Sequence, residues 1–407
     1  MPRRSAGPRL RGAPRESRAS SDRQSFQNER KGVVNVGQRL RVGVVGCGVI
    51  AQVMHLPHLR ELDDEYELAA ICDISTTVAE ACMREFGAAR AVSQWQDLLD
   101  MRLDAVLVLT SGSHAPIAIA AAESGAHVFV EKPMCLGPAE GRAMIEAASS
   151  AGVHLMVGTM KRYDPAYQRL LELLPQVDDV RLVRVTTLES PFEPYVRHYP
   201  LVAPDGVPPS VLEALREDDD RRLEAALPGA DEETRHCYRW MLLDNLVHEF
   251  NALRGALGEP DRVGFAELSR RVVAITMTFA GVDCHLSWVD LPGIARYRQE
   301  FMFLAPDQRV TLTLPSPYLR NMPSELTVEG GEPGGTHSWS RVEVVSYDEA
   351  FKRELVEFHA AIREDRPPHT DGIDGLHDVA LCHSIARVHM SGEAALAPSD
   401  LASAVQI

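Results

Sequence analysis

The sequence predicts an α/β protein that begins with a doubly wound parallel sheet and continues into a second, strand-rich domain. Short apolar runs alternate with helical segments from residue 40 to residue 158, and a glycine-rich turn joins the first run to the first helix. After residue 178 the pattern changes to strand-like runs separated by turn residues. A chain of 407 residues is long for one hydrophobic core and comfortable for two domains.

The apolar runs of the first domain have the composition of strands that are buried on both faces. They are short and rich in β-branched residues, and each is followed by residues with helical spacing. We expect strands at 41–45, 67–72, 105–109, 127–130 and 154–157, and helices at 52–62, 76–86, 95–101, 113–123 and 138–150. Parallel sheets of this kind bind ligands beyond the carboxyl ends of their strands, so the residues that follow each strand are the first site candidates.

The turn after the first strand has the glycine spacing of a dinucleotide-binding (Rossmann) fingerprint. Gly46 permits the tight turn, Gly48 has no Cβ to keep a pyrophosphate from the backbone, and Ala51 lets the helix pack closely. The helix N-terminus offers unpaired N–H groups to the phosphates. Such a turn also occurs without a ligand, but here the strand, helix, second strand and terminal acid are all present. We therefore expect a dinucleotide-binding domain at 39–160, with cofactor contacts at Gly46, Gly48, Val49 and Ile50.

The second expected strand ends on Asp73. A carboxylate at this position accepts hydrogen bonds from the hydroxyls of the adenine ribose, and its charge repels the 2′-phosphate of NADP. The sequence therefore predicts NAD, rather than NADP, as the cofactor.

A lysine follows the strand at 127–130, in the tripeptide Glu131-Lys132-Pro133. Proline fixes the backbone directly after the lysine, and Glu131 is able to orient the ammonium group or balance its charge. Taken alone, the tripeptide fits a functional lysine and a surface lysine in a loop equally well.

The helix expected at 238–257 carries an acid and a histidine on one face. Asp244 and His248 are four residues apart, a spacing that makes two side chains neighbours on an α-helix. A carboxylate beside an imidazole sets its tautomer and raises its basicity. A purely structural pair is the alternative. Metal ligation is a weaker third reading, because the segment has no recognised metal motif, and we expect no metal.

Four stretches together resemble the glucose–fructose oxidoreductase / inositol dehydrogenase (Gfo/Idh/MocA) family. They are VVGCGVIA at 44–51, GAHVFVEKP at 125–133, GTMKRYDP at 158–165 and DNLVH at 244–248, in the family's order and at its spacings. The resemblance covers about residues 40 to 395. The chain departs from the family pattern at Arg239-Trp240-Met241, where paired glycines are usual, and at Asn251, where an acid is usual.

The resemblance implies a role for most of the candidate residues. Lys132 would lie beside the nicotinamide and the substrate hydroxyl, and Asp244 and His248 match the family's catalytic acid and histidine. The expected catalytic residues are therefore Lys132, Asp244 and His248. The cofactor site would also include Thr110, His114 and Glu131, and the substrate site Arg162 and Tyr163 at its edge.

The resemblance also implies a second domain, at 161–395, with an open, largely antiparallel sheet and the substrate held between the domains. The strand-like runs at 180–188, 272–279, 282–289, 297–304 and 309–314 agree with this independently. Such a sheet would form a homodimer or homotetramer. A long connection at 190–236 interrupts the domain. Its residues Arg197, His198 and Tyr199 fit substrate contacts or a solvated insert equally well.

These expectations describe an NAD-dependent oxidoreductase that acts on a secondary alcohol of a sugar, cyclitol or related polyol. His248 would take the hydroxyl proton, Asp244 would orient the imidazole and Lys132 would stabilise the alkoxide, although Lys132 is an alternative base. A redox-cycling NAD-dependent glycosidase and a non-catalytic NAD-binding sensor are the other readings. The glycosidase would not release NADH into solution.

Composition excludes several other classes of protein. A net charge of −16 argues against nucleic acid or an anionic membrane as a partner. The seven scattered cysteines suit a reducing compartment, so we expect a cytoplasmic protein. The basic, Ser- and Pro-rich segment 1–38 and the segment 396–407 are expected to be tails outside the fold.

Overall fold

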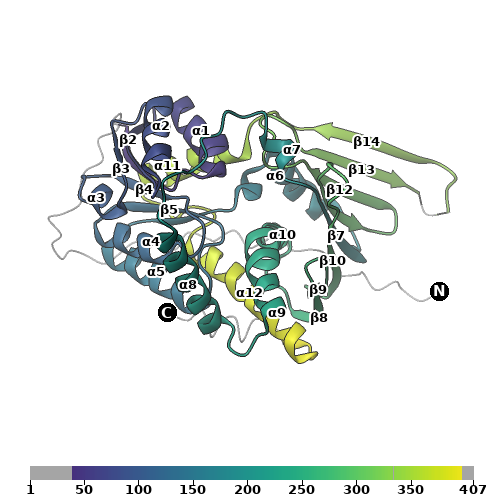
Figure 1. The fold of residues 1–407 in the computed structure, drawn as a ribbon. Coiled ribbons are helices and arrows are strands. Elements are labelled where there is room, and N and C mark those ends of the chain that lie inside the picture. The colour runs from purple at the N-terminus through teal and green to yellow at the C-terminus, as the bar shows by residue number, and fades with distance from the viewer. Residues whose placement is uncertain (1–38, 333, 397–407) are drawn as a thin grey trace, which may run out of the picture.

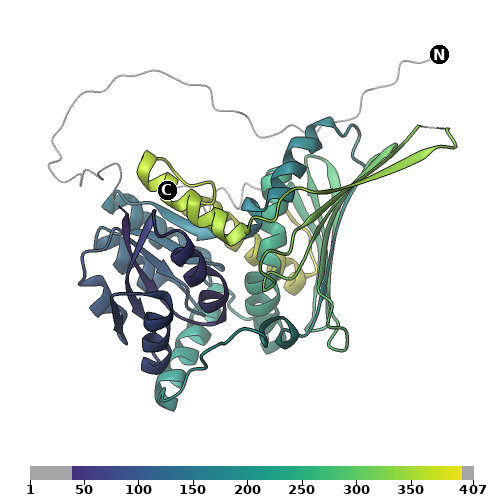
Figure 2. The same ribbon diagram turned by 90° about the horizontal axis from the view of Figure 1, so that it is seen from above.

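The computed structural model describes residues 39–332 and 334–396. The N-terminal tail expected at 1–38 lies outside the described residues, as does all but the first residue of the tail expected at 396–407. Within the described residues, two sheets form the two sides of the molecule, and helices α10 and α12 lie between them (Figures 1 and 2).

The first sheet has six strands, all parallel, in the order β3-β2-β1-β4-β5-β6. Its topology confirms the doubly wound arrangement, with the order reversing beside β1. The short strand β3 was not expected. The strands are β1 (Leu40–Val45), β2 (Tyr66–Cys72), β3 (Arg90–Val92), β4 (Ala105–Val108), β5 (His127–Glu131) and β6 (Leu155–Gly158).

Helices cover both faces of this sheet. They begin and end close to the expected positions, because apolar spacing and capping residues such as Ser75 and Gly152 act locally. The first expected helix differs, since it starts as the π-helix η1 before continuing as α1. The helices are η1 (Ala51–His55), α1 (Leu56–Glu61), α2 (Thr76–Phe86), α3 (Trp95–Leu99), α4 (Ala115–Glu123) and α5 (Pro138–Ala151).

The second sheet has nine strands in the order β14-β13-β12-β11-β7-β10-β9-β8-β15. Every neighbouring pair is antiparallel except β7 with β10, so the sheet is largely antiparallel, as expected. Its strands are β7 (Leu182–Glu189), β8 (Arg262–Leu268), β9 (Val272–Phe279), β10 (Val282–Asp290), β11 (Arg298–Leu304), β12 (Gln308–Leu314), β13 (Glu325–Gly331), β14 (Ser338–Val344) and β15 (Ala395–Leu396).

A second long helix is divided in the same way as the first. The helix expected at 238–257 consists of the π-helix η4 (Cys237–Leu246) followed by α10 (Val247–Leu257). A π-helix bonds each N–H group to the carbonyl five residues before it, so its turn is wider than that of an α-helix. Three short helices lead from the first sheet into the second: η2 (Met160–Tyr163), α6 (Pro165–Leu173) and η3 (Leu174–Gln176).

The connection at 190–236 is folded into helices rather than left as a loop. They are α7 (Glu193–Val196), α8 (Pro209–Ala226) and α9 (Glu232–His236). Helix α8 lies against the first domain: Arg222 pairs with Glu140 of α5, and the Asp219 carboxylate lies beside Gly112 in the loop after β4. The insert therefore forms part of the wall around the carboxyl ends of the first sheet (Figure 1).

The last two helices, α11 (Ala350–Glu364) and α12 (Gly372–Ser391), join the two domains. Leu355 and Phe358 of α11 share one hydrophobic core with Val42 and Val44 of β1, and the Tyr66 hydroxyl donates to Leu355 O at 2.6 Å. The far end of the chain therefore completes the face of the first sheet. Among the described residues, no helix combines the length and the apolar character needed to cross a membrane.

Candidate active site

The turn after β1 has room for a dinucleotide. Gly46 has a φ of +94°, and a Cβ there would lie 2.8 Å from backbone atoms of Leu109 and Thr110, so only glycine fits. At Gly48, by contrast, no atom lies within 4 Å of the place a Cβ would take. This open space before the continuous helix η1–α1 fits a phosphate group.

Asp73 is held at the mouth of the same turn. Its carboxylate oxygens accept hydrogen bonds from the backbone N–H of Cys47 at 2.8 Å and of Ser75 at 2.9 Å. Each oxygen keeps a further lone pair for a ribose hydroxyl. The predicted cofactor residues around Gly46 are thus brought together in an arrangement that fits the adenosine half of NAD.

His114 ties two loops of the first domain together. Its Nδ1 lies 2.8 Å from Pro133 O and its Nε2 lies 2.7 Å from Thr110 O. Burial lowers the pKa of His114, although the two carbonyl oxygens oppose this. Because both ring nitrogens already face protein carbonyls, His114 shapes the cofactor loop rather than offering a free nitrogen to a ligand.

Lys132 links the first domain to helix η4. Its Nζ donates to Asp244 O at 2.7 Å and to Asp244 Oδ1 at 3.2 Å. Burial lowers the pKa of Lys132, but the negative charges of Asp244 and Glu131 together outweigh this and raise it above its ordinary value. The Lys132 side chain therefore presents an ammonium cation at the carboxyl end of β5.

His248 lies near Lys132 but is not oriented by Asp244. Among the described residues its Nδ1 has no hydrogen-bond partner, and Asp244 instead contacts Lys132. No hydrogen bond or ion pair joins Asp244 to His248, two residues that the structure describes, so these contacts do not support the expectation that Asp244 orients the imidazole. Burial, and then the positive charges of Lys161 and Lys132, lower the pKa of His248 well below its ordinary value.

Lys161 is a further candidate that sequence reasoning did not single out, and its charge acts on His248. It is 4% exposed, and its Nζ donates to Gln299 Oε1 at 2.5 Å. The Gln299 amide in turn donates to Glu249, which also accepts from the Thr187 hydroxyl at 2.5 Å. Burial lowers the pKa of Lys161 to about 8, against the opposing charge of Glu249. The position of Lys161 just past a strand could have indicated it from the sequence. Nothing in the sequence indicated that Gln299 and Glu249 would be its partners.

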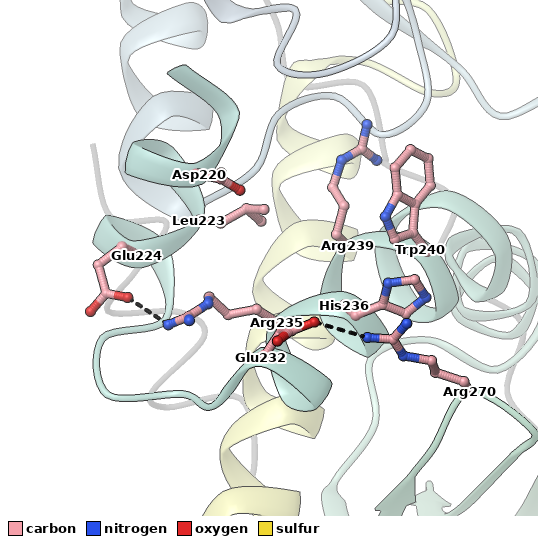
Figure 3. Close-up of a pocket in the computed structure, with 9 residues that line it drawn as sticks. All are labelled: Asp220, Leu223, Glu224, Glu232, Arg235, His236, Arg239, Trp240 and Arg270. Atoms are coloured by element: carbon pink, nitrogen blue, oxygen red, sulfur yellow. Dashed lines mark hydrogen bonds and ion pairs between the residues drawn. The ribbon is translucent and has the colours of Figure 1, made fainter. Parts of the chain in front are cut away.

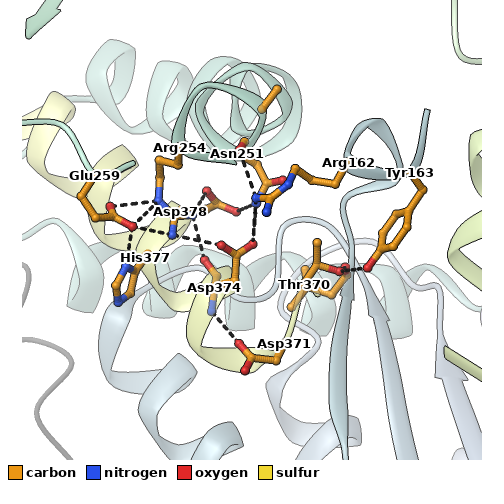
Figure 4. Close-up of polar contacts among 12 residues, drawn as sticks. Arg162, Tyr163, Asn251, Arg254, Glu259, Thr370, Asp371, Asp374, His377 and Asp378 are labelled. Carbon is orange, nitrogen blue, oxygen red and sulfur yellow. Dashed lines mark hydrogen bonds and ion pairs between the residues drawn. The ribbon is translucent and has the colours of Figure 1, made fainter. Parts of the chain in front are cut away.

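Arg162 and Tyr163, expected at the edge of the substrate pocket, belong to a different polar network (Figure 4). The Tyr163 hydroxyl lies 2.8 Å from Thr370 Oγ1, and Arg162 Nη1 lies 3.7 Å from Asp374 Oδ2. Their placement as substrate contacts is therefore not supported. Of these residues of the 3₁₀-helix η2, Lys161 rather than Arg162 contributes positive charge that lowers the pKa of His248.

The same network fixes helix α10 against α12. Arg254 of α10 pairs with Asp378 at 2.5 Å, with Asp374 at 3.1 Å and with Glu259 at 2.8 Å. Asn251 donates to Asp374 and Asp378 at 2.8 and 2.7 Å, and Arg254 is only 7% exposed. Buried charges that are fully paired in this way hold two helices in one geometry, and α10 carries His248.

A cavity of about 450 Å³ lies between the insert and helix η4 (Figure 3). Its walls include Leu223 of α8, Arg235 of α9 and the pair Arg239 and Trp240 of η4. The Arg239 guanidinium carbon lies 4.4 Å from the centre of the Trp240 ring, and the indole is 44% exposed. These are two of the positions at which the chain departs from the family pattern. They lie in the same π-helix as Asp244, beside the candidate site.

Residues 40–159 match the model of the Gfo/Idh/MocA family, described as an oxidoreductase family with an NAD-binding Rossmann fold. Residues 40–159 belong to this family. The protein is an oxidoreductase whose relatives are named dehydrogenases, and the family's cofactor is NAD or NADP.

Two relatives and one solved structure indicate the range of the family. The chain is 25% identical to myo-inositol 2-dehydrogenase of Thermotoga maritima over 83% of this chain and 92% of that protein. It is 31% identical to an NADP(+) scyllo-inositol 2-dehydrogenase of Bacillus subtilis over 36% of this chain, which spans 41% of that relative. A levoglucosan dehydrogenase in complex with NADH has the same fold, with a TM-score of 0.68 and 19% identity over 89% of this chain and all of that one.

Proposed function

We propose that the protein is an NAD-dependent dehydrogenase that transfers hydride between nicotinamide and a secondary alcohol of a sugar, cyclitol or related polyol. The single observation that carries the proposal is that Lys132 and Lys161, which follow strands β5 and β6 of the first sheet, both bring positive charge close enough to His248 to lower its pKa. Bound NAD would supply the hydride acceptor. The chain's own residues would bind the alcohol, remove its proton and hold the resulting oxygen charge.

The directions of the pKa shifts support a division of roles. The lowered pKa of His248 favours a neutral imidazole, which is able to accept a proton, whereas the raised pKa of Lys132 favours a cation. His248 is then the general base, and Lys132 stabilises the developing alkoxide. Lys161 donates to Gln299 in the absence of substrate and would supply a second cation near the same oxygen.

Asp73 supports NAD as the cofactor. Its carboxylate is fixed by Cys47 and Ser75, so it has little freedom to turn away from a 2′-phosphate. We also propose that the second sheet forms a homo-oligomer, because Phe265 and Val272 on its strands are 50% and 43% exposed. Size-exclusion chromatography with light scattering would test the oligomer, and a monomer would exclude it.

A panel of inositols, sugars and amino sugars with NAD, read by NADH absorbance, tests the proposed reaction. We expect NADH to accumulate with at least one polyol. Cleavage of a glycoside without accumulation of NADH would instead identify the redox-cycling reaction, and NAD binding without turnover of any compound would favour a sensor.

A further inference from the structure

A buried acidic cluster lies directly behind the candidate catalytic lysine. It consists of His55 of η1, Glu131 at the end of β5 and Glu354 of α11, and one nitrogen or oxygen atom from each side chain lies within 4.8 Å of the other two. The three residues are 0%, 5% and 0% exposed. Three elements that are far apart in the sequence thus place two carboxyl groups together in the protein interior.

Glu131 is fully engaged with its neighbours. Its Oε1 lies 2.7 Å from His55 Nε2, and its Oε2 accepts a hydrogen bond from the backbone N–H of Lys132 at 3.0 Å. Two donors therefore stabilise its carboxylate. The second contact fixes the backbone from which the Lys132 side chain extends, so Glu131 acts on the site both through geometry and through charge.

Glu354 has no such support. Among the described residues neither of its oxygens has a hydrogen-bond partner. The rings of Phe129 and Phe351 pack against His55, each with its centre 5.5 Å from the imidazole, so the surroundings are apolar. A buried carboxylate without hydrogen bonds is costly, and a carboxyl group in this position lowers its energy by keeping its proton.

A metal ion is the alternative that the three ligand types suggest. Two ligands of one tetrahedral zinc ion, each bonded at about 2.0 Å, lie about 3.3 Å apart. His55 Nε2 and Glu131 Oε1 are only 2.7 Å apart, which is the distance of a shared proton. The geometry therefore favours protons over a metal as the positive charge in the cluster.

We infer that Glu354 is a neutral, proton-holding residue and that, with His55, it leaves Glu131 as the lone negative charge that positions Lys132. The other titratable groups that face the cluster fit this assignment. Lys132, His114 and Tyr318 face Glu131, and Tyr163 faces Glu354. Lys132 is the only cation of this group. The role assigned to Lys132 rests on the proposed function, whereas the proton on Glu354 does not.

The proton on Glu354 makes a prediction about stability that needs no substrate. Burial, and then the charge of Glu131, raise the pKa of Glu354 well above 4.5. Above pH 4.5 the folded protein holds a proton that the unfolded chain releases, so this residue destabilises the fold increasingly as the pH rises. Glu354→Gln removes that penalty. We expect its melting temperature to exceed that of the wild type by at least about 2 °C at pH 8, and the difference to vanish toward pH 4.

Glu357 on the same helix provides a matched control. Burial would raise its pKa, but hydrogen bonds and charge from Arg366 lower it overall. Glu357→Gln should therefore lower the melting temperature at pH 8, opposite in sign to Glu354→Gln. If Glu354→Gln also destabilises the protein at pH 8, or if the purified protein holds a stoichiometric metal that this variant loses, the inference is wrong.

Kinetics then test the positioning role. Glu354→Leu should lower kcat about tenfold and move the alkaline limb of the pH profile to lower pH. Glu354→Gln, which keeps a neutral polar side chain of similar size beside Glu131, should leave both close to their wild-type values. Equal losses in the two variants would show that the cluster does not position Lys132. Failure to find a substrate would leave the melting experiment intact, so the two proposals fail separately.

Discussion

The contact between Lys132 and Asp244 predicts which pair of residues acts as a unit. Asp244→Asn removes the carboxylate that lies 3.2 Å from the Lys132 ammonium, but it leaves the backbone carbonyl that accepts at 2.7 Å. The Asp244 side chain is 41% exposed, so solvent screening limits the lost ion pair to at most about 1 kcal/mol. That free energy corresponds to roughly a fivefold loss in kcat/KM.

A double-mutant cycle measures this coupling. Lys132→Ala should cost about 10² or more in kcat/KM. Once Lys132 is removed, Asp244→Asn should cost almost nothing further, because its partner is gone. In combination with His248→Ala, by contrast, the losses should multiply, because no hydrogen bond joins Asp244 to His248. The assay is the initial rate of NADH formation for each single and double variant.

The pH dependence provides an independent check on the same variant. The Asp244 charge helps to raise the pKa of Lys132, so Asp244→Asn should move the alkaline limb of kcat/KM to lower pH. Two results together would refute this reasoning. The kcat/KM losses of Lys132→Ala and Asp244→Asn would multiply in the double variant, and those of Asp244→Asn and His248→Ala would not. Asp244 would then again be the residue that orients the imidazole.

Three further predictions concern the cofactor, the base and the tail. Calorimetry should show that NAD binds more tightly than NADP, because like charges about 4 Å apart repel by roughly 4 kcal/mol before relaxation. Asp73→Ser should reduce this difference in affinity. Tighter binding of NADP by the wild type would contradict the prediction. His248→Ala should lower turnover by about 10² or more and leave the affinity for NAD unchanged. Because the pKa of His248 is lowered from 6.5, the acid limb of the wild-type pH profile of kcat/KM should lie below pH 6.5. An acid limb above pH 6.5 would exclude His248 as the base. Deletion of residues 1–31 should leave the melting temperature and turnover unchanged, because that segment has no apolar face to bury; a lower melting temperature would show that it docks on the fold.

The features predicted well from the sequence are those that depend on nearby residues. The turn at Gly46, the caps at Ser75 and Gly152 and the apolar strands of the first sheet each follow from local backbone preferences and local spacing. The lysine at the end of β5 was predicted for the same reason, since parallel strands deliver the residues after them to one edge.

The features that were missed depend on partners distant in the chain. Asp244 and His248 were paired on α-helical spacing, but η4 is a π-helix docked on the first domain through the Tyr238 hydroxyl, which donates to Leu136 O at 2.8 Å. Lys161 contacts Gln299, which lies 138 residues further along the chain on strand β11 of the second sheet. Side-chain direction in such a 3₁₀ turn does not follow from sequence spacing alone.

Transfer of deuterium tests the central claim most directly. A polyol that the panel identifies as a substrate, deuterated at the carbon that bears the reacting hydroxyl, would be mixed with NAD and the wild-type protein, and the NADH formed would be analysed by mass spectrometry. Direct hydride transfer at a site built on Lys132, Lys161 and His248 predicts that NADH carries the deuterium and that His248→Ala forms it at least about 10² more slowly. NADH without deuterium, or an undiminished rate in the variant, would contradict the account.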